Sequence, residues 1–214
     1  ITGAVVLLGF DAIRNLLLTT SVFDLFSNRR KASLIRQEQF WDHSLGCAVG
    51  AKVIGNYVRY DKVEELFVSG LLHDIGKIVE MIFLQQAFKE INHLVKDQNI
   101  LMIAAEEKIL GYSHPLVGKL LAEKWNLPPK LVSVILHHHQ PSEAGRFVFE
   151  AAIVHLADIL CRSLNIGYGG DNKMPALDKL AWDSLRIKPQ VIESILAEIG
   201  KEFDENSLYI TYPP

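Results

Sequence analysis

A chain of 214 residues, 49% of them hydrophobic and 22% charged, is long enough to bury a sizeable core. Its net charge of −3, from 22 Lys and Arg against 25 Asp and Glu, gives no overall basic field for nucleic acid or an anionic membrane. Cys47 and Cys161 form no disulfide framework, and neither a secretory signal nor a membrane span is recognisable. We therefore expect a cytoplasmic protein.

Helical periodicity runs through the chain and predicts an all-α fold. Apolar residues recur at helix spacing within the first 26 residues, and a polar, basic turn follows at 27–33. Pro128 and Pro129 stand where proline is tolerated at a helix start. No segment shows the sustained alternation that is typical of a strand. Further helices are expected at 39–57, 63–73, 78–97, 99–110, 114–125, 129–138, 149–165 and 189–203.

The stretch NIGYGGDNKMP at 165–175 is rich in glycine and polar residues, and it is the clearest linker in the chain. This composition predicts a boundary between two parts. We expect a helical domain over residues 1–167, followed by a linker and a C-terminal helical extension over residues 168–214.

Some histidines and aspartates stand where an apolar side chain is expected. His43 lies on the apolar face of its helix, where a hydrogen-bonded core histidine is the alternative interpretation. In LLHDIGK (71–77), His73 and Asp74 interrupt an apolar run. A buried carboxylate is costly unless it is paired, hydrogen-bonded or bound to a metal. An ion pair between Asp74 and Lys77, three residues apart, is the alternative there.

Further candidates follow in the second half of the chain. His114 begins a predicted helix, and the alternative interpretation is that it is only a residue at a helix start. LHHHQP (136–141) places three histidines at the end of another helix. Successive side chains there point about 100° apart, so at most two neighbours can aim at one site. Asp158 sits in the apolar helix AAIVHLADILC, with Arg162 as an alternative ion-pair partner and His155 on the same face.

Together these positions favour a metal site. They lie on five separate helical segments, each at an apolar face or a helix end. Imidazole and carboxylate together suit the divalent ions Fe, Mn, Ni, Co and Zn. Seven such ligands exceed what one tetrahedral ion uses, which suggests two ions bridged by a carboxylate. No cysteine is expected in the cluster, which argues against a structural zinc site, and His93 and His137 are expected at the surface.

The order H…HD…H…HH…D resembles the HD superfamily of metal-dependent phosphohydrolases, and more closely the HDOD (HD-related output) domain of bacterial signalling proteins. The resemblance covers residues 1–167 and implies an HD-domain-like helical bundle. HDOD domains usually begin with several further helices, so we expect the N-terminal helices of the domain to be missing. The matching stretches are AVVLLGFDAIRNLLL, FWDHSLGCAVGAKVIG, ELFVSGLLHDIGKIVE, GYSHPLVGKLLAEKWNLPPKLVSVILHHHQP and VHLADILCRSLNIG.

The resemblance also implies a ligand set and a catalytic pair. The implied metal ligands are His43, His73, Asp74, His114, His138, His139 and Asp158. Asp74 would be the carboxylate that bridges two ions. Lys77 matches the lysine that reaches toward the substrate phosphate in related phosphodiesterases, so Lys77 and Asp74 are the implied catalytic residues.

The chain departs from the related HD-GYP cyclic-di-GMP phosphodiesterases in two places. After the paired histidines it reads QPSEAGRFVFE where those enzymes have a Gly-Tyr-Pro loop, and the GYG at 167–169 comes too late and lacks the proline. Gln39 stands where some of those enzymes carry a glutamate. These differences argue against a third metal ion and against cyclic-di-GMP as a substrate.

The pattern favours a regulatory module over an enzyme. We expect a signal-transduction domain that binds metal, has a nucleotide as a candidate ligand, and acts on a signalling partner or with an upstream sensor domain. Direct binding to nucleic acid or a membrane is not expected. The alternative is an active metal-dependent phosphohydrolase acting on a nucleotide or cyclic dinucleotide, because the ligand set is retained together with Lys77. A purely structural helical scaffold is the third hypothesis.

Overall fold

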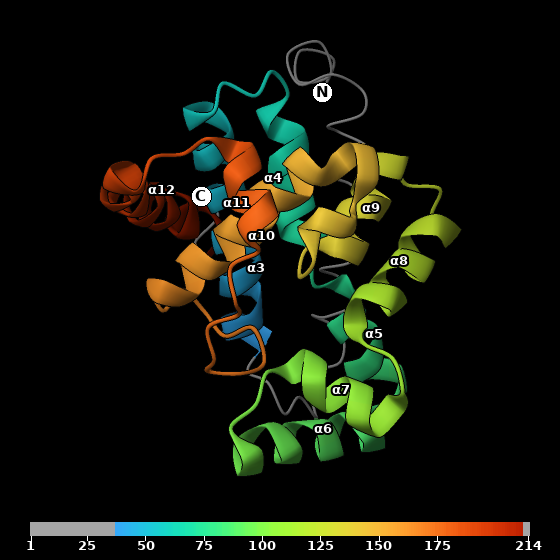
Figure 1. The fold of residues 1–214 in the computed structure, drawn as a ribbon. Helices are drawn as coiled ribbons and strands as arrows, with labels where there is room; N and C mark the ends of the chain where they lie inside the picture. Colours follow the sequence, from blue (N-terminus) through green and yellow to red (C-terminus); the bar gives the residue numbers. More distant parts are fainter. Residues whose placement is uncertain (1–36, 212–214) are drawn as a thin grey trace, which may run out of the picture. The chain divides into compact units, whose positions relative to one another are not determined.

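The computed structural model describes residues 37–211, with side chains from 38 to 205 (Figure 1). Three predictions lie outside the described residues: the helix in the first 26 residues, the turn at 27–33 and the N-terminal truncation. The α-helices are α3 (Gln37–Tyr57), α4 (Val63–Leu72), α5 (Ile75–Phe83), α6 (Gln85–Gln98), α7 (Met102–Leu110), α8 (His114–Lys124), α9 (Pro129–His137), α10 (Val148–Ser163), α11 (Lys179–Leu185) and α12 (Ile192–Thr211). Short 3-10 turns are η1 (Pro141–Glu143), η2 (Gly145–Phe147) and η3 (Pro189–Val191).

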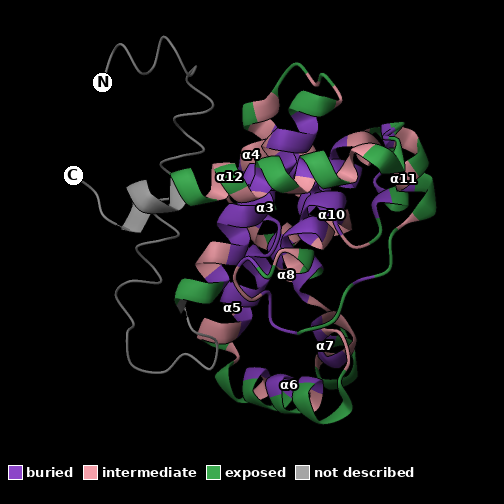
Figure 2. Ribbon diagram, turned by 90° about the vertical axis from the view of Figure 1, so that its left-hand side faces the viewer, coloured by how far each residue is buried: buried purple, intermediate pink, exposed green. Residues whose placement is uncertain are grey.

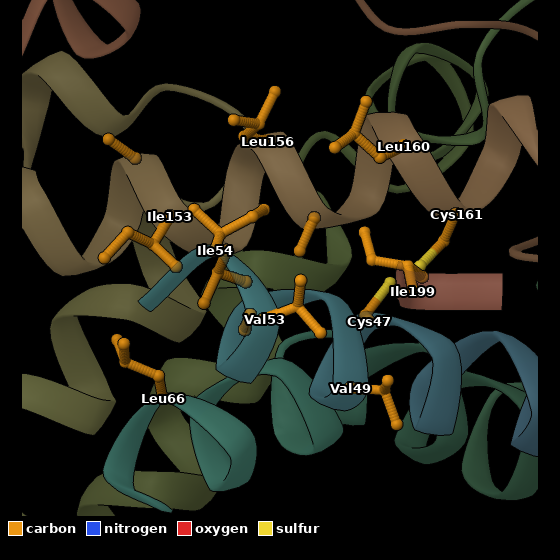
Figure 3. Packing of buried hydrophobic residues seen from close by; sticks show 14 of the residues in the cluster. Cys47, Val49, Val53, Ile54, Leu66, Ile153, Leu156, Leu160, Cys161 and Ile199 are labelled. Carbon is orange, nitrogen blue, oxygen red and sulfur yellow. The ribbon is translucent and has the colours of Figure 1, made fainter. Parts of the chain in front are cut away.

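The main hydrophobic core lies between α3 and α10, which pack against each other along their apolar faces. Small residues such as Ala51 of α3 and Ala157 of α10 are fully buried, which lets the two helices approach closely. Figure 3 shows the larger side chains that fill the space between them, among them Ile54 and Ile153, with Ile199 of α12 closing one side. Helix α4 packs on α3, α11 on α10, and α12 on α3.

The other helices extend this core in one direction. Helix α5 packs against α8, α8 packs against α9, and the paired helices α6 and α7 lie beyond α5 (Figures 1 and 2). Gly76 makes the α5–α8 crossing possible: a Cβ there would collide with the backbone oxygen of His114 and lie 2.8 Å from the nitrogen of Gly118. This close crossing brings the HDIGK turn to the first residue of α8.

The all-α prediction is confirmed for the described residues, which contain no strand. The prediction of one helix over 78–97 is wrong, because the chain bends at Leu84, where φ is −119° and ψ is 42°. Apolar residues keep their helical spacing from Ile78 to Phe88, and neither proline nor glycine marks the bend. Helix α11 was not predicted, since it is short; the Asp178 side chain caps it by accepting a hydrogen bond from the Ala181 N–H.

The segment 165–175 contains no helix, as predicted, and it packs against the helices. The Tyr168 N–H donates to the carbonyl of Gln39 at 2.7 Å, and the buried Asp171 carboxylate accepts from the Met102 N–H at 2.9 Å. The division into 1–167 and 168–214 stays a prediction. Within the described part of the chain, no helix combines the length and apolar character needed to cross a membrane.

Candidate metal centre

All seven of the predicted ligands come together inside the helical unit. Each lies on a helix face or at a helix end that points into the interior. All of them except His139 are at most 1% exposed. They come from α3 (His43), the turn between α4 and α5 (His73 and Asp74), the start of α8 (His114), the end of α9 (His138 and His139) and α10 (Asp158). His93 is exposed and His137 is half-buried, and neither is in the cluster.

The first group of donors contains His43, His73 and Asp158, together with Cys47. His43 Nε2 lies 3.2 Å from Asp158 Oδ1 and 3.7 Å from Cys47 Sγ. One donor atom from each of the four residues lies within 4.8 Å of every other. Cys47 is a correction to the sequence prediction, which expected no cysteine in the cluster. Its position four residues after His43, on the same helix face, was the signal that could have identified it.

The second group contains Asp74, His114, His138 and His139. Asp74 Oδ1 lies 3.2 Å from His114 Nε2 and 3.5 Å from His138 Nε2. His114 Nε2 in turn lies 3.4 Å from His138 Nε2 and 3.2 Å from His139 Nε2. Two nitrogen or oxygen ligands ~2.0–2.1 Å from one tetrahedral ion are about 3.3 Å apart. The spacing of these donor atoms therefore suits a single divalent ion.

The Asp74 carboxylate faces both groups. Its Oδ1 belongs to the second group, whereas its Oδ2 lies 3.4 Å from His73 Nε2 and 3.8 Å from His43 Nε2. Burial alone would raise the pKa of Asp74, but the neighbouring His73 and Lys77 outweigh it and hold the pKa well below its usual value. The carboxylate is therefore ionised and can share its two oxygens between two cations.

Three ligand rings are oriented by hydrogen bonds on their outer nitrogens. His73 Nδ1 lies 2.6 Å from the carbonyl of Gly70, and His138 Nδ1 lies 2.8 Å from the carbonyl of Ile135. His114 Nδ1 lies 2.7 Å from Glu106 Oε2. Because a carbonyl or carboxylate requires a donor, Nδ1 carries a proton in each ring, and Nε2 is the atom that points into the centre, where the neutral ring would offer its lone pair.

The pKa shifts of the histidines differ from ring to ring. In the first group, burial would lower the pKa of His43, but Cys47 and Asp158 outweigh it and raise the pKa to about 9. In the second group, burial lowers the pKa of His138 to about 4, and it holds the pKa of His139 well below its usual value. Burial would also lower the pKa of His114, but the charge of Glu106 and the hydrogen bond to Asp74 outweigh it and raise the pKa. Neutral imidazole is the form that binds metal, so His138 and His139 are ready to accept a cation at neutral pH.

A buried carboxyl pair supports His114 from behind, and the sequence interpretation missed it. Glu106 accepts hydrogen bonds from both the backbone N–H and Nδ1 of His114, at 2.8 and 2.7 Å. Burial, followed by the nearby charge of Glu106, raises the pKa of Glu80 to about 8. Glu80 is fully buried between Val79 and Met81 on α5, where an apolar residue would be expected.

The ion pairs that were the alternative interpretation of Asp74 and Asp158 are also present. Lys77 Nζ donates to Asp74 Oδ2 at 2.6 Å and to the carbonyl of Gly169 at 2.8 Å, and only 2% of its surface is exposed. Arg162 Nε donates to Asp158 Oδ1 at 2.8 Å. The bond from Lys77 to Gly169 attaches the segment 165–175 to the centre, and the two ion pairs leave Asp74 Oδ1 and the histidine Nε2 atoms facing one another. The proposed catalytic role of Lys77 stays a prediction.

His155 supports the second group without joining it. Its Nδ1 lies 2.7 Å from the backbone carbonyl of His138, and its Nε2 accepts the backbone N–H of Asp178 at 3.1 Å. The sequence suggested that His155 lies on the same helix face as Asp158. In the structure His155 holds the chain at the end of α9 in place through these hydrogen bonds.

Two cavities adjoin the centre. One of about 330 Å³ lies beside the first group and is lined by His43, Arg162 and the segment from Ile166 to Met174. The other, of about 440 Å³, lies beside the second group, where His139 lines it together with residues of α7, α8 and α9. Its charged lining residues are Glu107 and Glu143, and no lysine or arginine is among the described residues that line it.

Comparison with known proteins gives a consistent picture of the fold. The family model of the HDOD domain matches residues 1–141. An HDOD domain protein of unknown function from Geobacter sulfurreducens is 28% identical, with a TM-score of 0.78 over 97% of this chain and 72% of that one. A candidate signal transduction protein from Marinobacter aquaeolei VT8 is 18% identical, with a TM-score of 0.71 over 92% of this chain and 44% of that one.

A candidate phosphohydrolase from Shewanella amazonensis SB2B is 22% identical, with a TM-score of 0.68 over 95% of this chain and 76% of that one. Among curated sequences, an uncharacterized protein of Treponema pallidum (strain Nichols) is 23% identical over 143 residues, which are 65% of this chain. The match spans only 26% of the length of that relative.

Proposed function

The chain belongs to the HDOD domain family, and on that premise we propose that it is a metal-binding regulatory module of a bacterial signalling protein. One observation carries the proposal: histidines and aspartates from α3, α8, α10 and two helix junctions meet in two adjacent groups of donor atoms. Burying this many imidazole and carboxylate groups is costly without a cation to compensate them. A pair of divalent ions would supply that compensation.

The donor sets indicate which residues would hold the ions. His43, His73 and Asp158 would hold one ion and Asp74, His114, His138 and His139 the other, with Asp74 Oδ2 turned toward the first. Nitrogen and oxygen donors of this kind fit Fe, Mn, Ni, Co or Zn. When bound, the ions would supply positive charge that ties the ligand-bearing helices together, so metal binding would contribute to folding.

The surroundings of the centre support regulation over phosphodiester hydrolysis. Lys77, the residue expected to approach a phosphate, is buried and already donates to Asp74 and to the Gly169 carbonyl. The cavity beside His139 has Glu107 and Glu143 as its charged lining residues. Two carboxylates at this approach would repel a phosphodiester substrate.

In this role the centre would act as a junction between helices. Its donors come from α3 and α10, which form the main core, and from α8 and the end of α9, so a change in metal or ligand occupancy would shift α8 and α9 relative to α3 and α10. A signalling partner or an upstream sensor domain could read such a shift, and a nucleotide is a candidate ligand. The likeness to a candidate signal transduction protein agrees with this setting.

The second candidate function is a metal-dependent phosphohydrolase, and one observation favours it. His139 of the second group is half-buried and lines an open cavity, so a small molecule can approach this group from outside. Two ions that share a carboxylate are a common arrangement for activating water against a phosphorus centre.

A turnover screen separates the two functions. The chain is loaded with Mn²⁺, Fe²⁺ or Zn²⁺ and incubated with cyclic dinucleotides, nucleotides and a generic phosphodiester, while hydrogen exchange follows α8 and α9 with and without metal. We expect increased protection of these helices on metal binding and no turnover. Turnover that Asp74→Asn abolishes, with the fold intact and with the exposed-site control Asp97→Asn still active, would overturn the regulatory function in favour of the hydrolase.

A further inference from the structure

The first donor group contains a sulfur atom that the proposed nitrogen and oxygen ligands do not account for. We propose that Cys47 is a thiolate ligand of the ion in this group, alongside His43, His73 and Asp158. The inference rests on the proposed metal centre and adds to it a fourth ligand of different chemistry. It would make the two halves of the centre unequal in the metals they prefer.

The position of Cys47 on α3 places its sulfur beside a ligand nitrogen. Cys47 follows His43 by four residues, so both side chains lie on the same face of the helix. The distance from Cys47 Sγ to His43 Nε2 is 3.7 Å. A sulfur ~2.3 Å and a nitrogen ~2.0 Å from one tetrahedral ion are about 3.5 Å apart. The two atoms therefore already have nearly the separation that a shared ion requires.

An independent observation at His73 points to a cation at the same place. His73 is 1% exposed, and its Nδ1 is engaged by the Gly70 carbonyl, so in the neutral ring its Nε2 carries a lone pair. Within the described residues this Nε2 has no hydrogen-bond donor. Its donor atom lies within 4.8 Å of those of His43, Cys47 and Asp158. A buried lone pair without a donor is costly, and an ion placed between these atoms would satisfy it.

The alternative is that Cys47 is only a core residue. It is 0% exposed and belongs to the hydrophobic cluster between α3 and α10, where its sulfur lies close to Cys161 (Figure 3). Cys161 is equally buried and equally part of that cluster, but it belongs to neither donor group. The two cysteines therefore provide a matched pair, in which burial is the same and only the access to the donors differs.

A thiolate ligand would change the chemistry of the first group. On binding, the thiol proton is released to solvent and the sulfur lone pair is donated to the ion. Soft thiolate donors favour ions such as Zn²⁺ and Co²⁺ over the hard ions Mg²⁺ and Mn²⁺. The second group offers only imidazole and carboxylate, so it would accept the harder ions more readily than the first group.

Cobalt provides a direct test, because thiolate bound to Co²⁺ gives a charge-transfer absorption in the near ultraviolet that imidazole and carboxylate do not give. The full chain is loaded with Co²⁺, its cobalt content is measured, and its spectrum is recorded for the wild type, Cys47→Ser and Cys161→Ser. Circular dichroism verifies the fold of each variant. We expect the band in the wild type and in Cys161→Ser, and its loss in Cys47→Ser.

The wild-type spectrum decides the question even if Cys47→Ser does not fold. Bound cobalt without the charge-transfer band would overturn the thiolate ligand and leave the proposed metal centre intact. A band that survives in Cys47→Ser and disappears in Cys161→Ser would also overturn it. A folded chain that binds no cobalt would contradict both the thiolate ligand and the metal centre on which it rests.

Discussion

The two donor groups differ in how far they are enclosed. In the first group His43, His73 and Asp158 are each 1% exposed and Cys47 is 0% exposed; a cavity of about 330 Å³ lies beside this group too, but of these four residues only His43 lines it. In the second group His139 is half-buried and lines a cavity of about 440 Å³. Ligand shells that are closed by protein suit structural ions, whereas sites that exchange ligands keep an open position. From this contrast we assign a structural role to the first group, whose ion would hold the fold together. The second group would be the one that responds to ligands.

The largest expected effect comes from the residue that both groups share. Asp74→Ala should remove both ions, because Oδ1 serves the second group and Oδ2 faces the first. It also leaves the buried Lys77 without its carboxylate, and breaking a buried ion pair costs roughly 3–5 kcal/mol. Elemental analysis and urea unfolding measure the two effects.

Two further variants separate metal loss from the buried charge. Asp97→Ala, at an exposed position on α6, should change neither metal content nor stability. Asp74→Ala combined with Lys77→Met should recover much of the stability without recovering the metal. Full metal content in Asp74→Ala would show that the two groups are independent of this carboxylate.

A smaller effect is expected from the segment that encloses the first group. Gly167 has φ +63°, and a Cβ there would collide with the backbone of His43 and Gln39. Gly167→Ala should therefore displace the segment, destabilise the fold by about 1–3 kcal/mol and speed the release of one ion to a chelator.

Gly111→Ala is the matched control for Gly167→Ala. Gly111 also has positive φ, at +76°, but nothing lies within 4 Å of the position a Cβ would take. The control carries the backbone strain without the collision, so chelator release should remain at the wild-type rate. Equal acceleration in both variants would mean that the segment does not enclose the ion.

The smallest effect concerns the carboxyl pair behind the second group. Glu80 has its pKa raised from 4.5 to about 8, so the folded protein keeps a proton that the unfolded chain releases. Its contribution to stability is fully present below pH 4.5 and is lost as the pH rises through about 8. Glu80→Gln removes this loss and should stabilise the protein relative to wild type by about 1 kcal/mol at pH 9, with little difference at pH 5.

Urea midpoints at pH 5, 7 and 9, with chelator present, measure the Glu80 effect. Glu90→Gln, an exposed position on α6, is the control and should show the same midpoint as wild type at each pH. If Glu80→Gln and wild type lose stability in parallel between pH 7 and 9, Glu80 is not the group that titrates there.

Much of the centre could be predicted from single residues, because a polar group in an apolar helix is visible in the sequence. His43, Asp74 and Asp158 are of this kind, and the structure buries all three together. Two ions that share Asp74 were predicted, but which ligand belongs to which group could not be, since that depends on how α5 crosses α8 at Gly76 and on which face of α10 meets α3.

Other features could not be predicted, because the same local sequence pattern usually indicates an ordinary core or surface residue. Cys47 on an apolar face is typical of a core residue, and only its spacing from His43 indicated more. Glu106 stands in the charged run AAEEKIL, where a solvated side chain is usual, yet it is fully buried against His114. The apolar spacing continues through the bend at Leu84, so the periodicity predicted one helix where the structure has two, α5 and α6.

The central claim is that one buried carboxylate joins a closed and an open metal site. Native mass spectrometry of the intact chain during titration with Zn²⁺, followed by chelator, tests it most directly. We predict two successive additions of one ion each, with one ion released to chelator far more slowly than the other, and neither addition in Asp74→Ala. A folded chain that takes up no zinc, or takes up the same amount in Asp74→Ala, would contradict the account.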